Sequence, residues 1–202
     1  LCAVSDVREK LFQYRGYTPI PFLLAMILFA RPTDTTMLIG AILTLFGEMS
    51  RLWGVAYAGS LTRATGGVGA PEVVVAGPYA RVRNPLYVGN LLLYTGIGIM
   101  ANALVPWLVI VALVYFSLQY ALIVSLEEEF LETEFGADYL EYKRNVPRFL
   151  PRLTPFAHPA QEHQLPNWRE ALRSERRTLQ AIGIVLLILV AIWLRGWAWF
   201  SA

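Results

Sequence analysis

The sequence has few of the side chains that cross-link small proteins or bind metal ions. Its 202 residues include one cysteine, Cys2, and two histidines, His158 and His163. A single cysteine excludes an internal disulfide framework and a cysteine-based zinc site. The two histidines lie in a proline-rich stretch without metal-ligand spacing. We therefore expect no metal site.

Charge is also scarce. Only 16% of the residues are charged and 56% are hydrophobic, whereas soluble domains have about 25% and about 45–50%. The net charge of +2, without a basic stripe, argues against nucleic acid as a partner. The apolar excess argues against a disordered chain and favours a protein whose surface faces lipid.

The apolar residues lie in blocks long enough to cross a bilayer. Residues 86–126 form a 41-residue stretch without Asp, Glu, Lys or Arg, about twice what one crossing needs. It must fold back, and residues 102–106 are the natural turn. The sequence predicts a single all-α membrane domain over residues 1–202 with about five transmembrane helices, at residues 11–30, 36–58, 86–103, 105–126 and 178–201.

The positive charges predict the orientation. Of the 17 lysines and arginines, all except Arg31 and Arg195 lie in or beside residues 1–16, 52–85 and 127–177. Because basic residues concentrate on the cytoplasmic side, we expect the N-terminus and the polar segments 59–85 and 127–177 in the cytoplasm. The C-terminus then lies on the opposite side.

The first candidate site precedes the third predicted span. Gly77-Pro78 signals a turn, Pro85 suits the first turn of a helix, and Asn84 then occupies its N-cap position. Arg81 and Arg83 stand just before that helix. This pattern is typical of an anion site, but the arginines could equally anchor the span at the lipid headgroups.

The second candidate site is a run of three glutamates, Glu127 to Glu129, at the end of the fourth span. Adjacent carboxylates repel one another, so something cationic must offset them. Two interpretations remain open: a salt-bridge network and a pocket for a cationic ligand. Candidate partners for such a network are Arg81, Arg83, Lys143 and Arg144.

A glycine, Gly136, follows the glutamates at a position typical of a helix C-cap. We expect two short cytoplasmic helices there, at residues 127–135 and 139–145. Tyr139 and Tyr142 then share one side of the second helix, where they could close over a ligand or pack against it.

The second span carries a third feature. Glu48 and Arg51 lie three residues apart on one helix face, so they could pair with each other, line a polar pocket, or do both. Gly40, Gly47 and Gly54 repeat at heptad spacing and predict close packing against a neighbouring helix.

The two motifs together resemble the isoprenylcysteine carboxyl methyltransferase and phospholipid methyltransferase superfamily. The family pattern G-x-Y-x-x-x-R-H-P-x-Y-x-G matches residues 77–89, and E-E-x-x-L-x-x-x-F-G-x-x-Y-x-x-Y matches residues 127–142. The resemblance covers about residues 36–152. One position departs from the pattern: Asn84 replaces the usual histidine, and asparagine cannot carry charge or shuttle a proton.

The resemblance implies an integral membrane enzyme that binds S-adenosylmethionine. It implies that Glu127 and Glu128 face the cationic groups of this cofactor. The other implied cofactor-binding residues are Tyr79, Asn84, Pro85, Tyr87, Tyr139 and Tyr142. The acceptor is expected to be a lipid-like molecule that enters from the bilayer, and no obligate protein partner is evident.

The acceptor sets the demands on the chain. A carboxylate, as in prenylcysteine, needs no base, and Arg83 would orient its oxygens. A phospholipid amine must lose a proton, for which Glu48 or a glutamate of the triplet is the candidate base. Arg51 and Arg144 are candidate acceptor-binding residues. The alternative is an NADPH-dependent membrane reductase of the sterol type, although three glutamates suit its anionic cofactor poorly.

Overall fold

The computed structural model describes residues 7–59 and 72–200, and this part of the chain is all-helical, as predicted. Residues 60–71 of the polar segment 59–85, together with Cys2, lie outside the described residues. The described part contains no strand, and its helices are, in chain order, α1 (Val7–Tyr14), α2 (Pro19–Leu28), α3 (Asp34–Ala58), the 3-10 helix η2 (Gly77–Ala80), α4 (Pro85–Ala101), α5 (Trp107–Asn145), the 3-10 helix η3 (Pro159–Glu162) and α6 (Trp168–Phe200).

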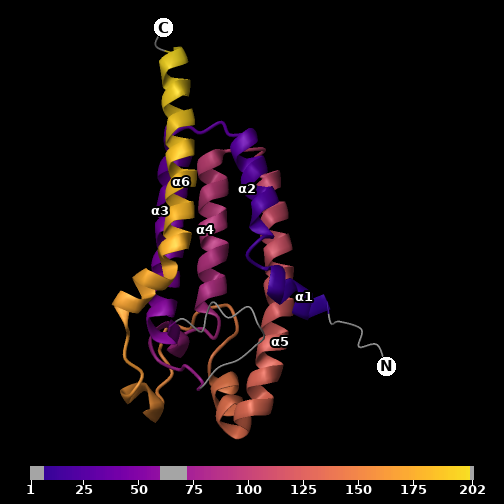
Figure 1. The fold of residues 1–202 in the computed structure, drawn as a ribbon, viewed down its shortest axis with the longest axis vertical. Helices are drawn as coiled ribbons and strands as arrows, with labels where there is room; N and C mark the ends of the chain where they lie inside the picture. The colour runs from indigo at the N-terminus through magenta and orange to yellow at the C-terminus, as the bar shows by residue number, and fades with distance from the viewer. Residues whose placement is uncertain (1–6, 60–71, 201–202) are drawn as a thin grey trace.

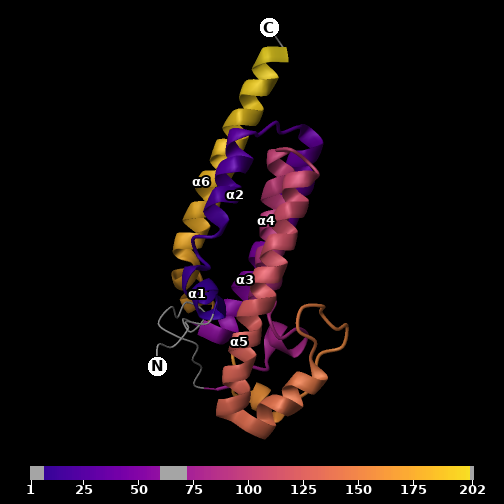
Figure 2. The same ribbon diagram turned by 90° about the vertical axis from the view of Figure 1, so that its right-hand side faces the viewer.

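Helices α2 to α6 run side by side in an elongated bundle (Figures 1 and 2). Helix α3 ends, and helices α4 and α6 begin, at the same end of the bundle. We call this the charged end. The last part of α5 lies at the same end and bends back toward the bundle (Figure 2). Both segments predicted to carry the site therefore meet at one end of the molecule.

Three helices, α3, α5 and α6, are long and apolar enough to cross a membrane. Helices α2 and α4 are apolar but shorter. The predicted spans 36–58 and 86–103 correspond closely to α3 and α4. The predicted turn is confirmed: α4 ends at Ala101, and Asn102 adopts a left-handed conformation with φ 49°.

The prediction was wrong at two points in the chain. The first predicted span, 11–30, is broken between Tyr14 and Pro19, because Gly16 is a poor helix former and Pro19 lacks the N–H that a continuing helix needs. Residues 127–135 are not a separate helix but continue α5, and the bend comes at Gly136, with φ 52°. Helix α6 begins at Trp168, so it includes most of the predicted last span and extends ten residues before it.

The glycine stripe packs against α4, as predicted. A Cβ placed on Gly47 would lie 2.6 Å from the Leu93 nitrogen and 2.7 Å from the Gly89 oxygen. A Cβ on Gly40 would lie 2.5 Å from the Gly96 oxygen. Glycines on both helices therefore let the backbones of α3 and α4 touch, which fixes the position of α4 and of the motif at its start.

Candidate cofactor and acceptor site

The turn before α4 places the first motif. Gly77 has φ 60°, and a Cβ there would lie 2.3 Å from the Tyr57 ring, so the turn needs glycine. Pro85 occupies the first turn of α4, with Asn84 at the N-cap position. The Asn84 side chain makes no capping hydrogen bond; its Nδ2 donates instead to the Arg148 carbonyl, at 3.1 Å. Asn84 thus links the start of α4 to the segment after α5.

A cavity of about 180 Å³ lies between the two motifs at the charged end. We call it the tyrosine cavity. Six of the eight predicted cofactor-binding residues line it, and so does Arg83, whereas Pro85 and Tyr87 do not. Its lining residues are Ala58, Glu72, Val73, Val74, Tyr79, Arg83, Asn84, Glu127, Glu128, Leu131, Tyr139 and Tyr142.

Glu127 is the first residue of the charged part of α5, which follows an apolar stretch that ends at Leu126. Its Oε1 accepts a hydrogen bond of 2.9 Å from the Tyr87 hydroxyl. Burial raises the pKa of the Glu127 carboxyl to about 7, although the Tyr87 hydrogen bond and the charge of Arg15 act in the opposite direction. Glu127 therefore changes charge near neutral pH.

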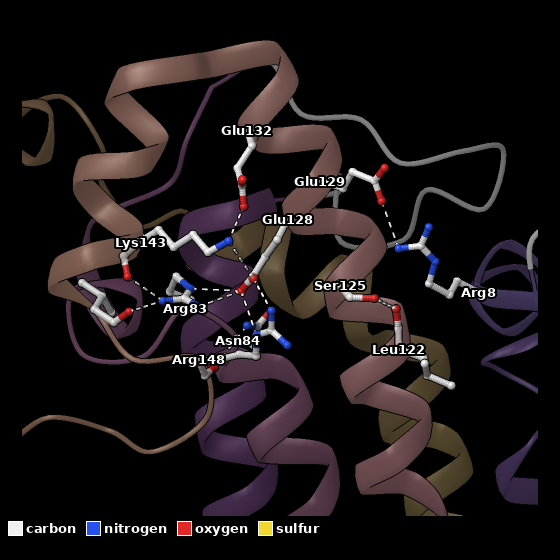
Figure 3. Close-up of polar contacts among 11 residues, drawn as sticks. Arg8, Arg83, Asn84, Leu122, Ser125, Glu128, Glu129, Glu132, Lys143 and Arg148 are labelled. Carbon is white, nitrogen blue, oxygen red and sulfur yellow. Dashed lines mark hydrogen bonds and ion pairs between the residues drawn. The ribbon is translucent and has the colours of Figure 1, made fainter.

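Glu128 is the most strongly paired carboxylate at the charged end (Figure 3). Its side chain is only 4% exposed, and its Oε1 accepts from Arg83 Nη2 at 2.9 Å. Arg148 also donates to both of its oxygens, and Lys143 Nζ lies 3.7 Å away. Burial alone would raise its pKa, but the hydrogen bonds from Arg148 and Arg83 hold the pKa below its ordinary value. The salt-bridge interpretation is thus confirmed for Glu128.

Arg83 joins the two motifs. Besides Glu128, its guanidinium donates to the carbonyls of Lys143, at 2.8 Å, and Val146. Its backbone nitrogen donates to the Pro147 carbonyl, at 2.9 Å. Arg83 therefore lines the tyrosine cavity with a guanidinium that is already bound on several sides.

The two tyrosines after Gly136 lie on one side of their helix, as predicted. Both are buried, with ring centroids 6.1 Å apart. The Tyr142 hydroxyl donates to the Tyr79 carbonyl, at 2.8 Å, so the end of α5 is fastened to η2. Burial raises the pKa of Tyr79, Tyr139 and Tyr142 above the ordinary value, which keeps the hydroxyls protonated.

A second cavity, of about 290 Å³, shares Glu128 with the first. Lys143 lies between Glu128 and Glu132 and pairs with both (Figure 3). The Glu129 side chain points away from Lys143 and binds Arg8 at 2.9 Å. Glu128 and its cationic partners thus separate the two cavities. The second cavity is lined by Ser125, Glu128, Glu129, Glu132, Thr133, Lys143 and Arg148.

The charged pair on α3, Glu48 and Arg51, precedes Ala58, the α3 residue that lines the tyrosine cavity, by about two to three turns of helix. Arg51 Nε is 3.4 Å from Glu48 Oε2, which confirms the predicted pair. Arg51 Nη2 also donates to Glu175 Oε2 of α6, at 2.6 Å, and Nη1 donates to Asn90 Oδ1 of α4. Neither Glu48 nor Arg51 lines the tyrosine cavity.

Sequence reasoning did not single out Arg148, Asn90 or Glu175, which contact the predicted residues. Arg144 is exposed and lines neither cavity. Arg148 lies just past the second motif, so its position was a usable signal. Nothing in local spacing indicates that Asn90 and Glu175 meet Arg51, because the three residues belong to different helices.

The geometry agrees with a comparison against known families. A profile described as phospholipid methyltransferase matches residues 35–138, slightly more than half of the chain. The chain belongs to the phospholipid methyltransferase family. The resemblance seen in the sequence is thereby confirmed, and the matched segment runs from the start of α3 to just past the bend at Gly136.

Two proteins with similar sequences are named for resistance to metals. The chain is 33% identical over 142 residues to the cobalt-zinc-cadmium resistance protein CzcN of Cupriavidus metallidurans, covering 67% of this chain and 61% of that protein. It is 30% identical over 140 residues to the nickel-cobalt-cadmium resistance protein NccN of Alcaligenes xylosoxydans xylosoxydans, covering 66% and 61%. The alignments thus span about three fifths of the curated relatives' length. No solved structure matches the chain.

Both relatives are named for metal resistance, so the presence of a metal centre bears on the comparison. Within residues 7–59 and 72–200, no group of three or more His, Cys, Asp or Glu side chains is arranged to hold a metal ion.

Proposed function

We propose that this protein is a membrane methyltransferase that transfers a methyl group from S-adenosylmethionine to a lipid-like acceptor at the cytoplasmic face. The observation that carries the proposal is the tyrosine cavity, where both halves of the family pattern meet around Glu127. Family membership supports the reaction class. The cofactor and the acceptor are inferred from the chemistry of the site.

The residues at the cavity fit the cofactor's charges. S-adenosylmethionine carries a sulfonium and an ammonium, and Glu127 offers a partly buried carboxylate with one protein donor identified, Tyr87. The cofactor's carboxylate suits the amide groups and the positive dipole end at the start of α4. Val73, Val74 and Leu131 give the cavity an apolar side for the adenine.

The cavity is small for the whole cofactor. Its volume of about 180 Å³ is below the roughly 300–1,000 Å³ of typical small-molecule sites. We propose that the side chains around it move outward when the cofactor enters. Tyr139 and Tyr142, behind the bend at Gly136, are placed to close over it again.

We assign different roles to the neighbouring carboxylates. Glu127 binds the cationic part of the cofactor. Glu128, already paired with Arg83 and Arg148, holds the two motifs together. The bound cofactor supplies an activated methyl group, and the chain aligns it with the acceptor and excludes water.

We favour an amine acceptor over a carboxylate. Arg83, the candidate for orienting a carboxylate, donates through all three guanidinium nitrogens to Glu128 and to two backbone carbonyls. Among the described residues, each terminal nitrogen of Arg51 donates to one residue, so each keeps a second N–H for an acceptor. An amine acceptor must lose a proton, and Glu48 is the proposed base, with Arg51 beside it binding the acceptor's polar group. We propose no such role for the exposed Arg144.

We propose that the charged end faces the cytoplasm. Fifteen of the 17 lysines and arginines support this orientation, with the N-terminus inside and the C-terminus outside. We also propose that α2 and α4 lie within the bilayer beside α3, α5 and α6, which gives five membrane segments. The acceptor then enters from the lipid between helices, and the expected partners are membrane lipids.

The proposal is tested by binding and transfer with the full chain in lipid nanodiscs. S-adenosylmethionine and NADPH are titrated in parallel, and methyl-labelled cofactor is incubated with a lipid extract fractionated by headgroup. We expect binding of S-adenosylmethionine and label in an amine-lipid fraction. Binding of NADPH alone would support the reductase alternative, and no label in any fraction would contradict methyl transfer to lipid.

A further inference from the structure

We propose that Glu175 of α6 is a positioning residue for methyl transfer. In this role it holds the Arg51 guanidinium in the position where we propose that Arg51 binds the acceptor. This inference rests on the proposed function, in which Arg51 binds the acceptor's polar group. It goes beyond family membership, because the matched segment ends at residue 138 and α6 lies outside it.

Three helices hold the Arg51 side chain. Nη2 donates to Glu175 Oε2 at 2.6 Å, Nη1 donates to Asn90 Oδ1, and Nε lies 3.4 Å from Glu48 Oε2. A guanidinium is a rigid planar fork, so partners on three sides fix its orientation as well as its position. Gly89 provides the room: a Cβ there would lie 2.7 Å from Arg51 Cγ.

The register between α6 and α3 brings Glu175 to this point. The two helices run antiparallel along their length (Figures 1 and 2). Ala171 is fully buried and packs with Val55 near the charged end, and Trp193 Nε1 donates to Asp34 Oδ1 at 2.8 Å near the other end. Glu175 is one turn beyond Ala171, as Arg51 is one turn before Val55, so the two side chains meet.

The burial of Glu175 requires an ionic partner. It is 1% exposed on a helix that is otherwise mostly exposed in its apolar part. A charge inside a membrane protein is costly unless it is paired, and such charges mark functional sites. Contact between the helices alone would not need a buried ion pair, because apolar residues of similar volume stabilise such a contact as well.

A chain of contacts also connects Arg51 and its partners to the tyrosine cavity, where we propose that the cofactor binds. Asn90, which accepts from Arg51, is a side-chain hydrogen-bond partner of Tyr120. The Tyr120 ring lies 4.6 Å from the Tyr87 ring, and the Tyr87 hydroxyl donates to Glu127. Along this route a shift of Arg51 reaches the cavity through several contacts, whereas it acts directly on an acceptor bound beside it.

This arrangement separates acceptor effects from cofactor effects. The described residues that line the tyrosine cavity include none from α6. Loss of the Glu175 carboxylate should therefore leave S-adenosylmethionine affinity unchanged and reduce transfer. A purely structural contact would instead lower stability without a selective effect on the acceptor.

The experiment compares E175Q and E175D in the full chain in nanodiscs, with E134Q as an exposed glutamate control. Vesicles of phosphatidylethanolamine and a farnesylated cysteine serve as amine and carboxylate acceptors. For E175Q we expect a cofactor Kd within twofold of wild type and at least a tenfold fall in acceptor kcat/KM. E175D should recover part of that loss. In a double-mutant cycle with R51K, the losses should not multiply.

Each other outcome overturns the inference. Wild-type kcat/KM in a folded E175Q, or independent multiplying losses with R51K, would show that Glu175 does not act through Arg51. If E175Q does not fold, the test rests on E175D, which keeps the carboxylate but displaces it. A wild-type kcat/KM for E175D would then contradict a positioning role. Transfer by wild type to neither acceptor would contradict the proposed function itself, and the inference with it.

Discussion

The Tyr87 hydroxyl donates a hydrogen bond of 2.9 Å to Glu127 Oε1 and thereby joins the first turn of α4 to the charged part of α5. The two residues are 40 positions apart, one in each half of the family pattern. The hydroxyl occupies one acceptor position of a carboxylate that has several. Glu127 therefore keeps capacity for a ligand in the cavity, whereas neighbouring Glu128 is bound by arginines on both oxygens.

This contrast predicts unequal effects of two substitutions on cofactor affinity. E127Q removes the carboxylate assigned to the cationic part of S-adenosylmethionine, and we expect Kd to rise at least tenfold, since a charge-assisted contact is lost. E129Q is the matched control, because Glu129 is 64% exposed and does not line the tyrosine cavity. Isothermal titration in detergent measures both. Equal Kd values for wild type and E127Q would contradict the assignment.

Cofactor binding should depend on pH through Glu127. Burial raises its pKa to about 7, so without ligand the carboxyl is neutral below this pH and negative above it. A cationic ligand favours the ionised form, so affinity should increase as pH rises from 5.5 to 7.5, by up to tenfold per unit below the pKa. Higher pH is avoided because amino groups begin to lose their charge near 7.7–8.0.

The control for this profile is E127Q, in which the increase should be absent. If E127Q shows the same slope as wild type, another group is responsible for the pH dependence. Titrations at each pH in buffers of equal ionic strength exclude screening as the cause.

Glu128 should matter for stability more than for direct contact with the cofactor. E128Q leaves Arg83 and Arg148 without a buried anionic partner, and breaking such a pair costs roughly 3–5 kcal/mol. We expect a clear fall in the thermal unfolding temperature of E128Q. The exposed pair of Glu129 with Arg8 is worth about 0–1 kcal/mol, so E129Q should unfold near the wild-type temperature. A wild-type unfolding temperature for E128Q would show that the pair is dispensable.

The sequence predicted the helices wherever a long apolar run ended at a strong local signal. Helix α4 begins at Pro85 and ends before Asn102, and both residues are visible as boundary signals. The break before Pro19 was not predicted, because only Arg15 and Gly16 interrupt the apolar and uncharged residues around it. Residues 168–177 of α6 precede the predicted span because their charges exclude them from an apolar run.

At the site, the residues of the two motifs were predictable because each motif lies on one short segment. The pairing of Arg51 with Glu175 was not, because it depends on the register of α6 against α3 over 124 positions of sequence. The different hydrogen-bond partners of Glu127 and Glu128 could not be predicted from the sequence either. They depend on which side of α5 meets Arg148, and this is a property of the folded chain.

The glycine contacts between α3 and α4 give a last prediction, about packing. G47A would place a Cβ 2.6 Å from the Leu93 nitrogen and 2.7 Å from the Gly89 oxygen. Both are backbone atoms, so α3 and α4 must separate, and we expect a loss of about 1–3 kcal/mol in stability. G183A is the matched control, because no atom lies within 4 Å of its added Cβ. It should stabilise α6 by up to about 1 kcal/mol, since alanine is the better helix former. Thermal unfolding of the two variants should therefore shift in opposite directions, and a shift of the same sign would show that the glycine stripe does not set the distance between α3 and α4.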